Sequence, residues 1–151
     1  QVSDYTIGVF DSLAKLLLNP VVKCVVKPFM KDVYKYVPVF NRLKEEHKAG
    51  KDPILRKATA LLLIHTPKSN RFGSEDANLA YQNASLMAQS LGVSQIYMGF
   101  VLTAIRQEGK DTLAKTRGID GKIQAIMALG IPAFKYPKYT DRKEIVKNYI
   151  E

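Results

Sequence analysis

The sequence has little of what most metal and thiol sites require. Its 151 residues include one cysteine, Cys24, and two histidines, His47 and His65. One cysteine forbids an internal disulfide and any four-cysteine zinc or iron–sulfur site. Neither histidine has a second ligand at the spacing that metal sites use. Because cysteine is scarce, a reducing, cytoplasmic location is the expectation.

Several familiar signatures are also missing. The chain contains no tryptophan, and aromatic residues make up 9% of it. It contains neither the G-x-G-x-x-G fingerprint of dinucleotide sites nor the G-x-x-x-x-G-K-[ST] phosphate loop. No apolar run is long enough to cross a bilayer. With 46% apolar and 25% charged residues, the composition is that of a globular domain, and the length predicts a single domain over residues 1–151.

Positive charge is what the chain has in excess, with a formal net charge of +9. Such a balance favours contact with anions but does not choose among phosphate groups, nucleic acid and acidic lipid. Its most regular feature is a lysine stripe within Pro20–Pro38, where Pro28 should kink or split a helix. One interpretation is contact with a membrane surface; the favoured one is a solvated face over a core or dimer contact. The stripe consists of Lys23, Lys27, Lys31 and Lys35.

The most organised stretch runs from Ala58 to Phe100. The apolar run Ala58–His65 predicts a strand that is buried on both faces. After a polar loop, Ser74 is the predicted cap of a long helix, and Gly92 should end that helix in a left-handed conformation. Val93–Phe100 then predicts a short strand that closes on Gly99.

Periodicity also predicts the elements on either side of this stretch. We expect a helical front segment over residues 1–57 and a core over residues 58–151. Strands that interleave with helices indicate an α/β or α+β layered domain. The further elements expected are helices over Ser3–Leu18, Phe40–Ala49 and Val101–Gln107 and a third strand over Lys122–Leu129.

Two segments carry a resemblance to a known family. They are LLLIHTPKSNRFGSEDANLAYQNASLMAQSLGVSQIYMGF, Leu61–Phe100, and IDGKIQAIMALGIPAFKYPKYTDRKE, Ile119–Glu144. In order and spacing they resemble the central and C-terminal parts of the FMN-dependent nitroreductase family. The resemblance implies an α+β fold, with a mixed sheet flanked by helices and an intertwined homodimer.

The resemblance also implies an activity. A member would be an FMN-dependent NAD(P)H oxidoreductase that reduces nitroaromatics, quinones or similar small-molecule acceptors by a ping-pong route. A flavin brings its own redox chemistry, so the protein need supply only binding, orientation and access, without an obligatory catalytic side chain. The implied partners are NAD(P)H, the electron acceptor and a second copy of the chain. Nucleic acid is not among them.

The same resemblance assigns the site. The turn before Phe100 corresponds to the family's loop along the isoalloxazine ring, and Gly99 would let the backbone approach closely. Many members have an acidic residue where Met98 stands. In the basic tail, arginine suits a phosphate because its planar fork binds two oxygens at once. The implied FMN-binding residues are Ile96, Tyr97, Met98, Gly99, Lys138 and Arg142.

The front of the sequence departs from the family pattern. An arginine-rich phosphate segment and an Asn-Ser-Gln-type turn lie near the N-terminus of typical members, and neither occurs in Gln1–Ala60. The resemblance therefore predicts a chain that lacks the family's N-terminal portion. Two alternatives follow: a degenerate or truncated flavin-binding scaffold without activity, and a basic module that binds membrane or nucleic acid through its lysines.

Overall fold

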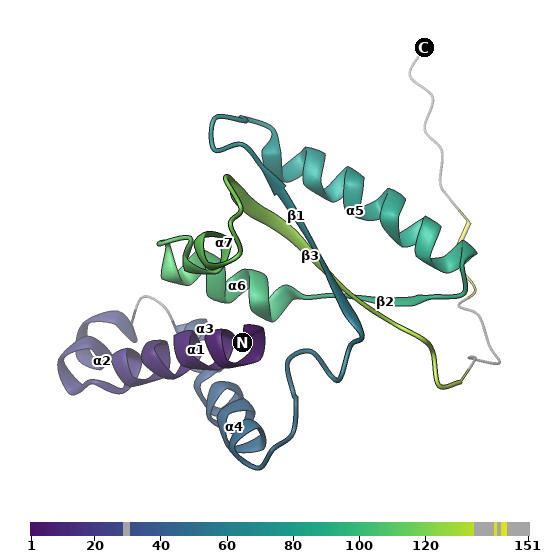
Figure 1. Cartoon of the computed structure of the whole chain (residues 1–151). Helices are drawn as coiled ribbons and strands as arrows, with labels where there is room; N and C mark the ends of the chain where they lie inside the picture. Colours follow the sequence, from purple (N-terminus) through teal and green to yellow (C-terminus); the bar gives the residue numbers. More distant parts are fainter. Residues whose placement is uncertain (29–30, 135–140, 142, 145–151) are drawn as a thin grey trace.

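A three-stranded sheet with helices on both faces forms the centre of the fold (Figure 1). The computed structural model describes residues 1–28, 31–134, 141 and 143–144. The strands are β1 (Ala60–Thr66), β2 (Ser94–Tyr97) and β3 (Lys122–Gly130), in the order β1-β3-β2. The expected α+β class is confirmed. Both pairs among the described strands are antiparallel, so the mixed pairing that we expected is not seen among them.

The middle strand, β3, is the most buried element. Ala125, Ile126 and Met127 are completely inaccessible to solvent. β1 lies at an edge, and the prediction that it is buried on both faces is wrong: Leu62 is 38% exposed and His65 is exposed. An edge strand has a neighbour on one side only, so its apolar run is less covered than the run itself predicts.

Helix α5 (Gly73–Ser90) packs against all three strands on one face of the sheet. The predicted cap is wrong, because the helix begins at Gly73 and Ser74 is already its second residue. A methyl group at Gly73 would collide with Oγ1 of Thr66, so the close approach of the helix to the end of β1 requires glycine here. Glu75 and Asp76 lie in the first turn, where the helix dipole favours negative charge.

The end of α5 is as predicted. Gly92 has a φ of +71°, in the left-handed region. Its amide donates to the carbonyl of Gln89, and the amide of Val93 donates to the carbonyl of Ala88 at 2.8 Å. This pair of bonds is the Schellman motif, which turns the chain sharply into β2.

Helices α6 (Gly99–Glu108) and α7 (Thr112–Thr116) follow β2, and α6 packs on β3 from the other face of the sheet. The predicted strand over Val93–Phe100 is too long, because β2 ends at Tyr97 and Phe100 already belongs to α6. The chain turns into the helix two residues earlier than its apolar pattern indicates.

The front of the chain forms α1 (Val2–Leu18), α2 (Pro20–Val26), α3 (Lys31–Tyr34) and α4 (Val37–Lys48). Phe10 of α1 stacks on Phe40 of α4 at 4.5 Å between ring centroids and meets Phe100 of α6 edge-on. Tyr5 donates a 2.7 Å hydrogen bond to Glu108 at the end of α6. One hydrophobic cluster, which includes Phe10 and Ile126, joins α1, α4 and α6 to the sheet.

We predict that Gly121→Ala lowers the free energy of unfolding by about 1–3 kcal/mol. Gly121 has a φ of +153°, and an added methyl group would lie 2.6 Å from the carbonyl oxygen of Thr66. Chemical denaturation measures the effect. Gly8→Ala is the control: it faces open space in α1 and should add about 0.5–1 kcal/mol. Equal midpoints for the two variants would contradict the prediction.

Candidate functional site

The junction between β2 and α6 contains the four predicted ring-binding residues, and the structure does not place their side chains on one face. Successive residues of a strand point to opposite faces of the sheet. Ile96 is 52% exposed and borders a cavity at the end of the sheet. Tyr97 points to the face that α5 covers, where its ring meets Tyr81 edge-on at 5.0 Å between centroids.

A polar network fixes β2 against α5 on the Tyr97 side. The hydroxyl of Tyr81 donates to Oε1 of Gln95, and Nε2 of Gln95 donates to Oγ of Ser85 at 3.0 Å. Burial raises the pKa of the Tyr81 phenol, and the nearby Tyr97 raises it further. Tyr81 therefore stays a neutral donor near neutral pH, and this network holds β2 in register with the helix.

Met98 is a core residue. Its side chain is 6% exposed and belongs to the central hydrophobic cluster. Its amide donates to the carbonyl of Ile126 at 3.0 Å, and its carbonyl accepts from the amide of Leu102. An acidic residue here would bury a carboxylate among apolar side chains, which is costly without a partner. Methionine is apolar, so it can be buried at this position without that cost.

Gly99 opens α6, and no side chain caps the amides of the first turn. That turn also contains no acidic residue, so the positive end of the helix dipole is not neutralised by its own sequence. A methyl group added at Gly99 would have ordinary contacts with the Tyr97 ring at 3.9 Å. The fold itself therefore does not need glycine here.

A cavity of about 190 Å³ lies where the chain enters β1 and where β2 and β3 meet. Two cations at its rim, Arg56 and Lys57, were missed by the sequence analysis, since nothing in the residues around them indicates a site. Neither side chain has an ion pair or hydrogen bond among the described residues. The residues that line this cavity include Arg56, Lys57, Thr59, Ser94 and Ile96.

The two predicted phosphate-binding residues, Lys138 and Arg142, lie outside the described residues. Their role therefore stays a prediction.

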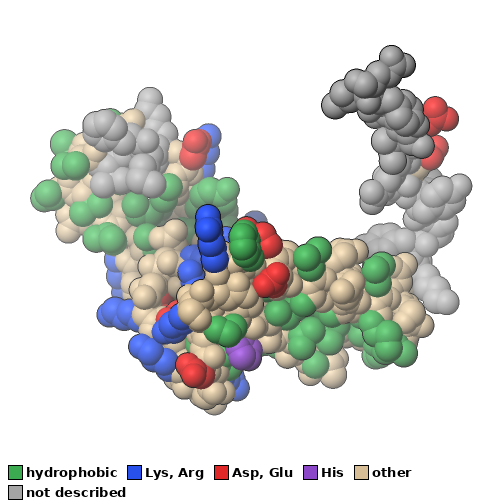
Figure 2. Space-filling model, turned by 90° about the horizontal axis from the view of Figure 1, so that it is seen from above, with side chains coloured by type: hydrophobic (Ala, Val, Ile, Leu, Met, Phe, Trp, Pro, Cys, Tyr) green, Lys and Arg blue, Asp and Glu red, His purple; other side chains and the backbone are tan. Residues whose placement is uncertain are grey.

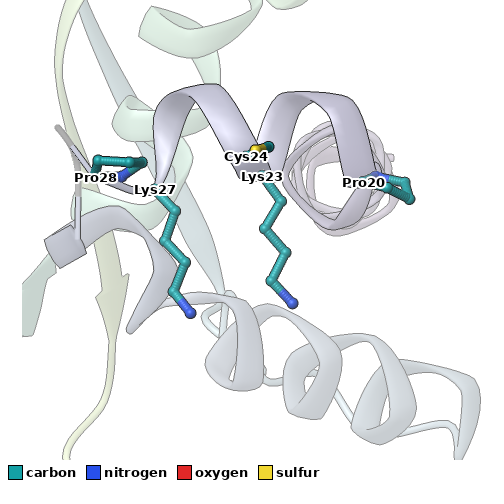
Figure 3. Close-up of a pocket in the computed structure, with 5 residues that line it drawn as sticks. All are labelled: Pro20, Lys23, Cys24, Lys27 and Pro28. Carbon is teal, nitrogen blue, oxygen red and sulfur yellow. The ribbon is translucent and has the colours of Figure 1, made fainter.

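The lysine stripe of the front segment is divided: Lys23 lies in α2 and Lys27 directly follows it, whereas Lys31 begins α3 and Lys35 directly follows that helix. As predicted, Pro28 separates α2 from α3. Lys23 and Lys27 extend side by side around an open hollow (Figure 3), whereas Lys35 forms a 2.6 Å ion pair with Asp32. Val21 and Val25 are 73% and 62% exposed. Val37, at the end of the same segment, is 7% exposed and belongs to the core. The interpretation of a solvated lysine face over a core or dimer contact stays a prediction.

Among the residues that the structure describes, no helix is long and apolar enough to cross a membrane. The same residues contain no group of three or more His, Cys, Asp or Glu side chains that could hold a metal ion.

Comparison with known proteins identifies the family. The sequence model of the nitroreductase family matches residues 9–131, from within α1 to the end of β3. The chain belongs to the nitroreductase family, as the resemblance predicted. This membership indicates a flavin-dependent oxidoreductase. No curated protein sequence and no solved structure matches the chain.

We predict that Gly99→Ala weakens flavin binding by about tenfold, equivalent to about 1.4 kcal/mol, and leaves the free energy of unfolding unchanged or slightly higher. Alanine fits within the protein at this position, so a loss of affinity would come from a ligand that approaches the backbone. Quenching of flavin fluorescence measures the affinity. Gly8→Ala, far from the junction in α1, should bind flavin as the wild type does; an unchanged affinity of Gly99→Ala would contradict the prediction.

Proposed function

We propose that the chain is an FMN-dependent NAD(P)H oxidoreductase that passes electrons to nitroaromatic, quinone or similar acceptors. The observation that carries this proposal is the family match over residues 9–131. The β2–α6 junction supports it, because it combines an exposed apolar side chain, Ile96, with a helix start that no side chain caps.

The described residues fit what FMN requires of a protein. A flavin needs an apolar wall for its ring, donors near the edge that gains negative charge on reduction, and cations for its phosphate. Ile96 offers the wall, and the first amides of α6, from Gly99 onward, offer the donors. Arg56 and Lys57 are unpaired cations at the same cavity that Ile96 borders. Lys138 and Arg142 remain the predicted phosphate ligands of the tail.

Each of these residues would bind or orient rather than react. FMN, when bound, supplies the acceptance and release of electrons. The N-terminus of α6 would stabilise negative charge that develops nearby, because its amides and dipole are fixed in advance. Ile96 would exclude water from the ring, and Gly99 would allow the close approach. No described side chain is required to transfer a proton.

A homodimer is part of the proposal, and the outer face of α5 supports it. Phe72, Leu79 and Leu86 recur every seven residues and are 60%, 67% and 56% exposed. This spacing places them on one side of the helix, opposite the buried Ala77 and Ala88. In the view from above, hydrophobic side chains lie exposed over the part of the molecule where α5 runs (Figure 2). We propose that a second copy covers this stripe.

The visible absorption spectrum of the purified full chain, recorded after incubation with FMN and removal of the excess, tests the activity. We expect a retained flavin spectrum that NADH or NADPH bleaches without oxygen and that a quinone or nitroaromatic acceptor restores. A chain that retains no FMN would contradict the proposal and favour the scaffold without activity. Retained FMN that neither nucleotide reduces would leave a flavin-binding protein of another kind.

Leu79→Glu should convert the dimer into a monomer, since it places a charge in the middle of the proposed contact. Sedimentation velocity measures the change. Gln89→Glu is the matched control, because it adds the same charge to the same helix outside the Phe72, Leu79 and Leu86 stripe. A wild-type chain that sediments as a monomer, or an equal effect of both variants, would contradict this contact.

A further inference from the structure

The turn that leads into β1 has a backbone conformation that its residues rarely adopt. Arg56 and Lys57 have φ values of +53° and +61°. For a residue with a Cβ, the left-handed region costs about 1–2 kcal/mol. Two such residues in succession form an outlier of the kind that clusters at functional sites, and the outlier requires an explanation.

Specific hydrogen bonds hold this turn. The carboxylate of Asp52 accepts from the amide of Leu55 at 3.0 Å and from the amide of Lys57 at 3.1 Å. It also accepts from the hydroxyl of Ser3 on α1, at 2.9 Å. Beyond the turn, the amide of Thr59 donates to the carbonyl of Leu129 on β3. The strained residues are therefore fixed between α1 and the sheet.

The turn presents four unpaired donors to one cavity. Arg56, Lys57, Thr59 and Ser94 are among the residues that line it, and none of their exposed side chains has an ion pair or hydrogen bond among the described residues. None of the described lining residues is acidic. Some other cations are neutralised at close range, for example Lys44 by Asp11 at 2.5 Å, whereas Lys23 and Lys27 also have no ion pair among the described residues. The cavity therefore combines positive charge with free hydrogen-bond donors.

The size of the cavity limits what it can hold. Its volume of about 190 Å³ is below the roughly 300–1,000 Å³ of pockets that enclose whole drug-sized ligands. A phosphate group fits such a volume, and a guanidinium binds its oxygens in pairs while a lysine adds a point charge.

We propose that Arg56, Lys57, Thr59 and Ser94 form a phosphate subsite. The proposal rests on the proposed function, because Ile96 lines this cavity and is also the expected apolar wall for the flavin ring. The phosphate would come either from FMN or from the 2′-phosphate of NADPH. The same chemistry recognises both.

Replacing Lys57 distinguishes a side chain that binds phosphate from one that merely faces solvent. Glycine adopts a positive φ without strain, so Lys57→Gly should stabilise the fold. If the lysine side chain serves phosphate, the same change must weaken phosphate binding. Stability and binding then move in opposite directions, which a lysine that merely faces solvent would not produce.

The experiment compares wild type, Arg56→Gln and Lys57→Gly with Lys115→Gln, an exposed lysine of α7 outside this cavity. Inorganic phosphate is the first probe, followed through the amide NMR signals of Lys57 and Thr59. We expect these signals to shift at millimolar phosphate in wild type and Lys115→Gln, and to shift much less in the other two variants. Denaturation should show Lys57→Gly to be more stable than wild type.

Two ligand pairs identify the source of the phosphate. FMN against riboflavin reports on the flavin phosphate, and NADPH against NADH reports on the 2′-phosphate. We expect Arg56→Gln to bind either FMN or NADPH about tenfold more weakly than wild type does. Its affinity for the matching ligand without that phosphate, riboflavin or NADH, should be unchanged. Retained flavin together with unshifted amides would overturn the subsite and leave the proposed function standing. Shifted amides in a chain that binds neither flavin would support the subsite and overturn the proposed function.

Discussion

The pairing of β3 on both of its edges is the constraint on which the candidate site depends. Thr59, just before β1, donates to Leu129, and Ile96 of β2 lies opposite Ala128. Beyond β2, the amide of Met98 continues the ladder to Ile126 and fixes where α6 begins. Two segments far apart in the sequence, the turn before β1 and the β2–α6 junction, thus meet on β3. A change that disturbs this strand would move the cavity, the apolar wall and the helix start together.

Alternation along β2 decides what kind of site this can be. Ile96 and Tyr97 are neighbours in the chain but face opposite sides of the sheet, and Met98 is buried between α6 and β3. The junction therefore offers a ligand one apolar side chain and a helix start rather than a cluster of reactive groups. Such an arrangement suits a cofactor that carries its own chemistry and needs mainly orientation and a favourable field.

Local rules predicted the features that depend on local physics. The amphipathic pattern found α1, Pro28 separated two helices, and Gly92 ended α5. The predictions that were wrong concern residues whose conformation depends on contacts with distant parts of the chain. Ser74 was expected to cap α5, but the start of the helix is set by the approach of Gly73 to Thr66. The conformation of Arg56 and Lys57 could not be predicted, because neither is glycine and the bond from Ser3 to Asp52 joins residues far apart in the sequence.

The net charge of +9 does not by itself make the chain selective for one kind of anion. It attracts any anion over distances of about a Debye length, roughly 8–10 Å at physiological salt, and it does not distinguish one anion from another.

Selectivity requires donors that are fixed before the ligand arrives, since ordering them afterwards costs conformational entropy. At Arg56 and Lys57 the backbone is fixed in this way, because Asp52 and β3 hold it from both sides. The hollow beside Lys23 and Lys27 has cations too, but they extend from a short helix whose described contacts are mainly with α1. Of the two basic regions, the strained turn is therefore the one for which we propose a phosphate subsite.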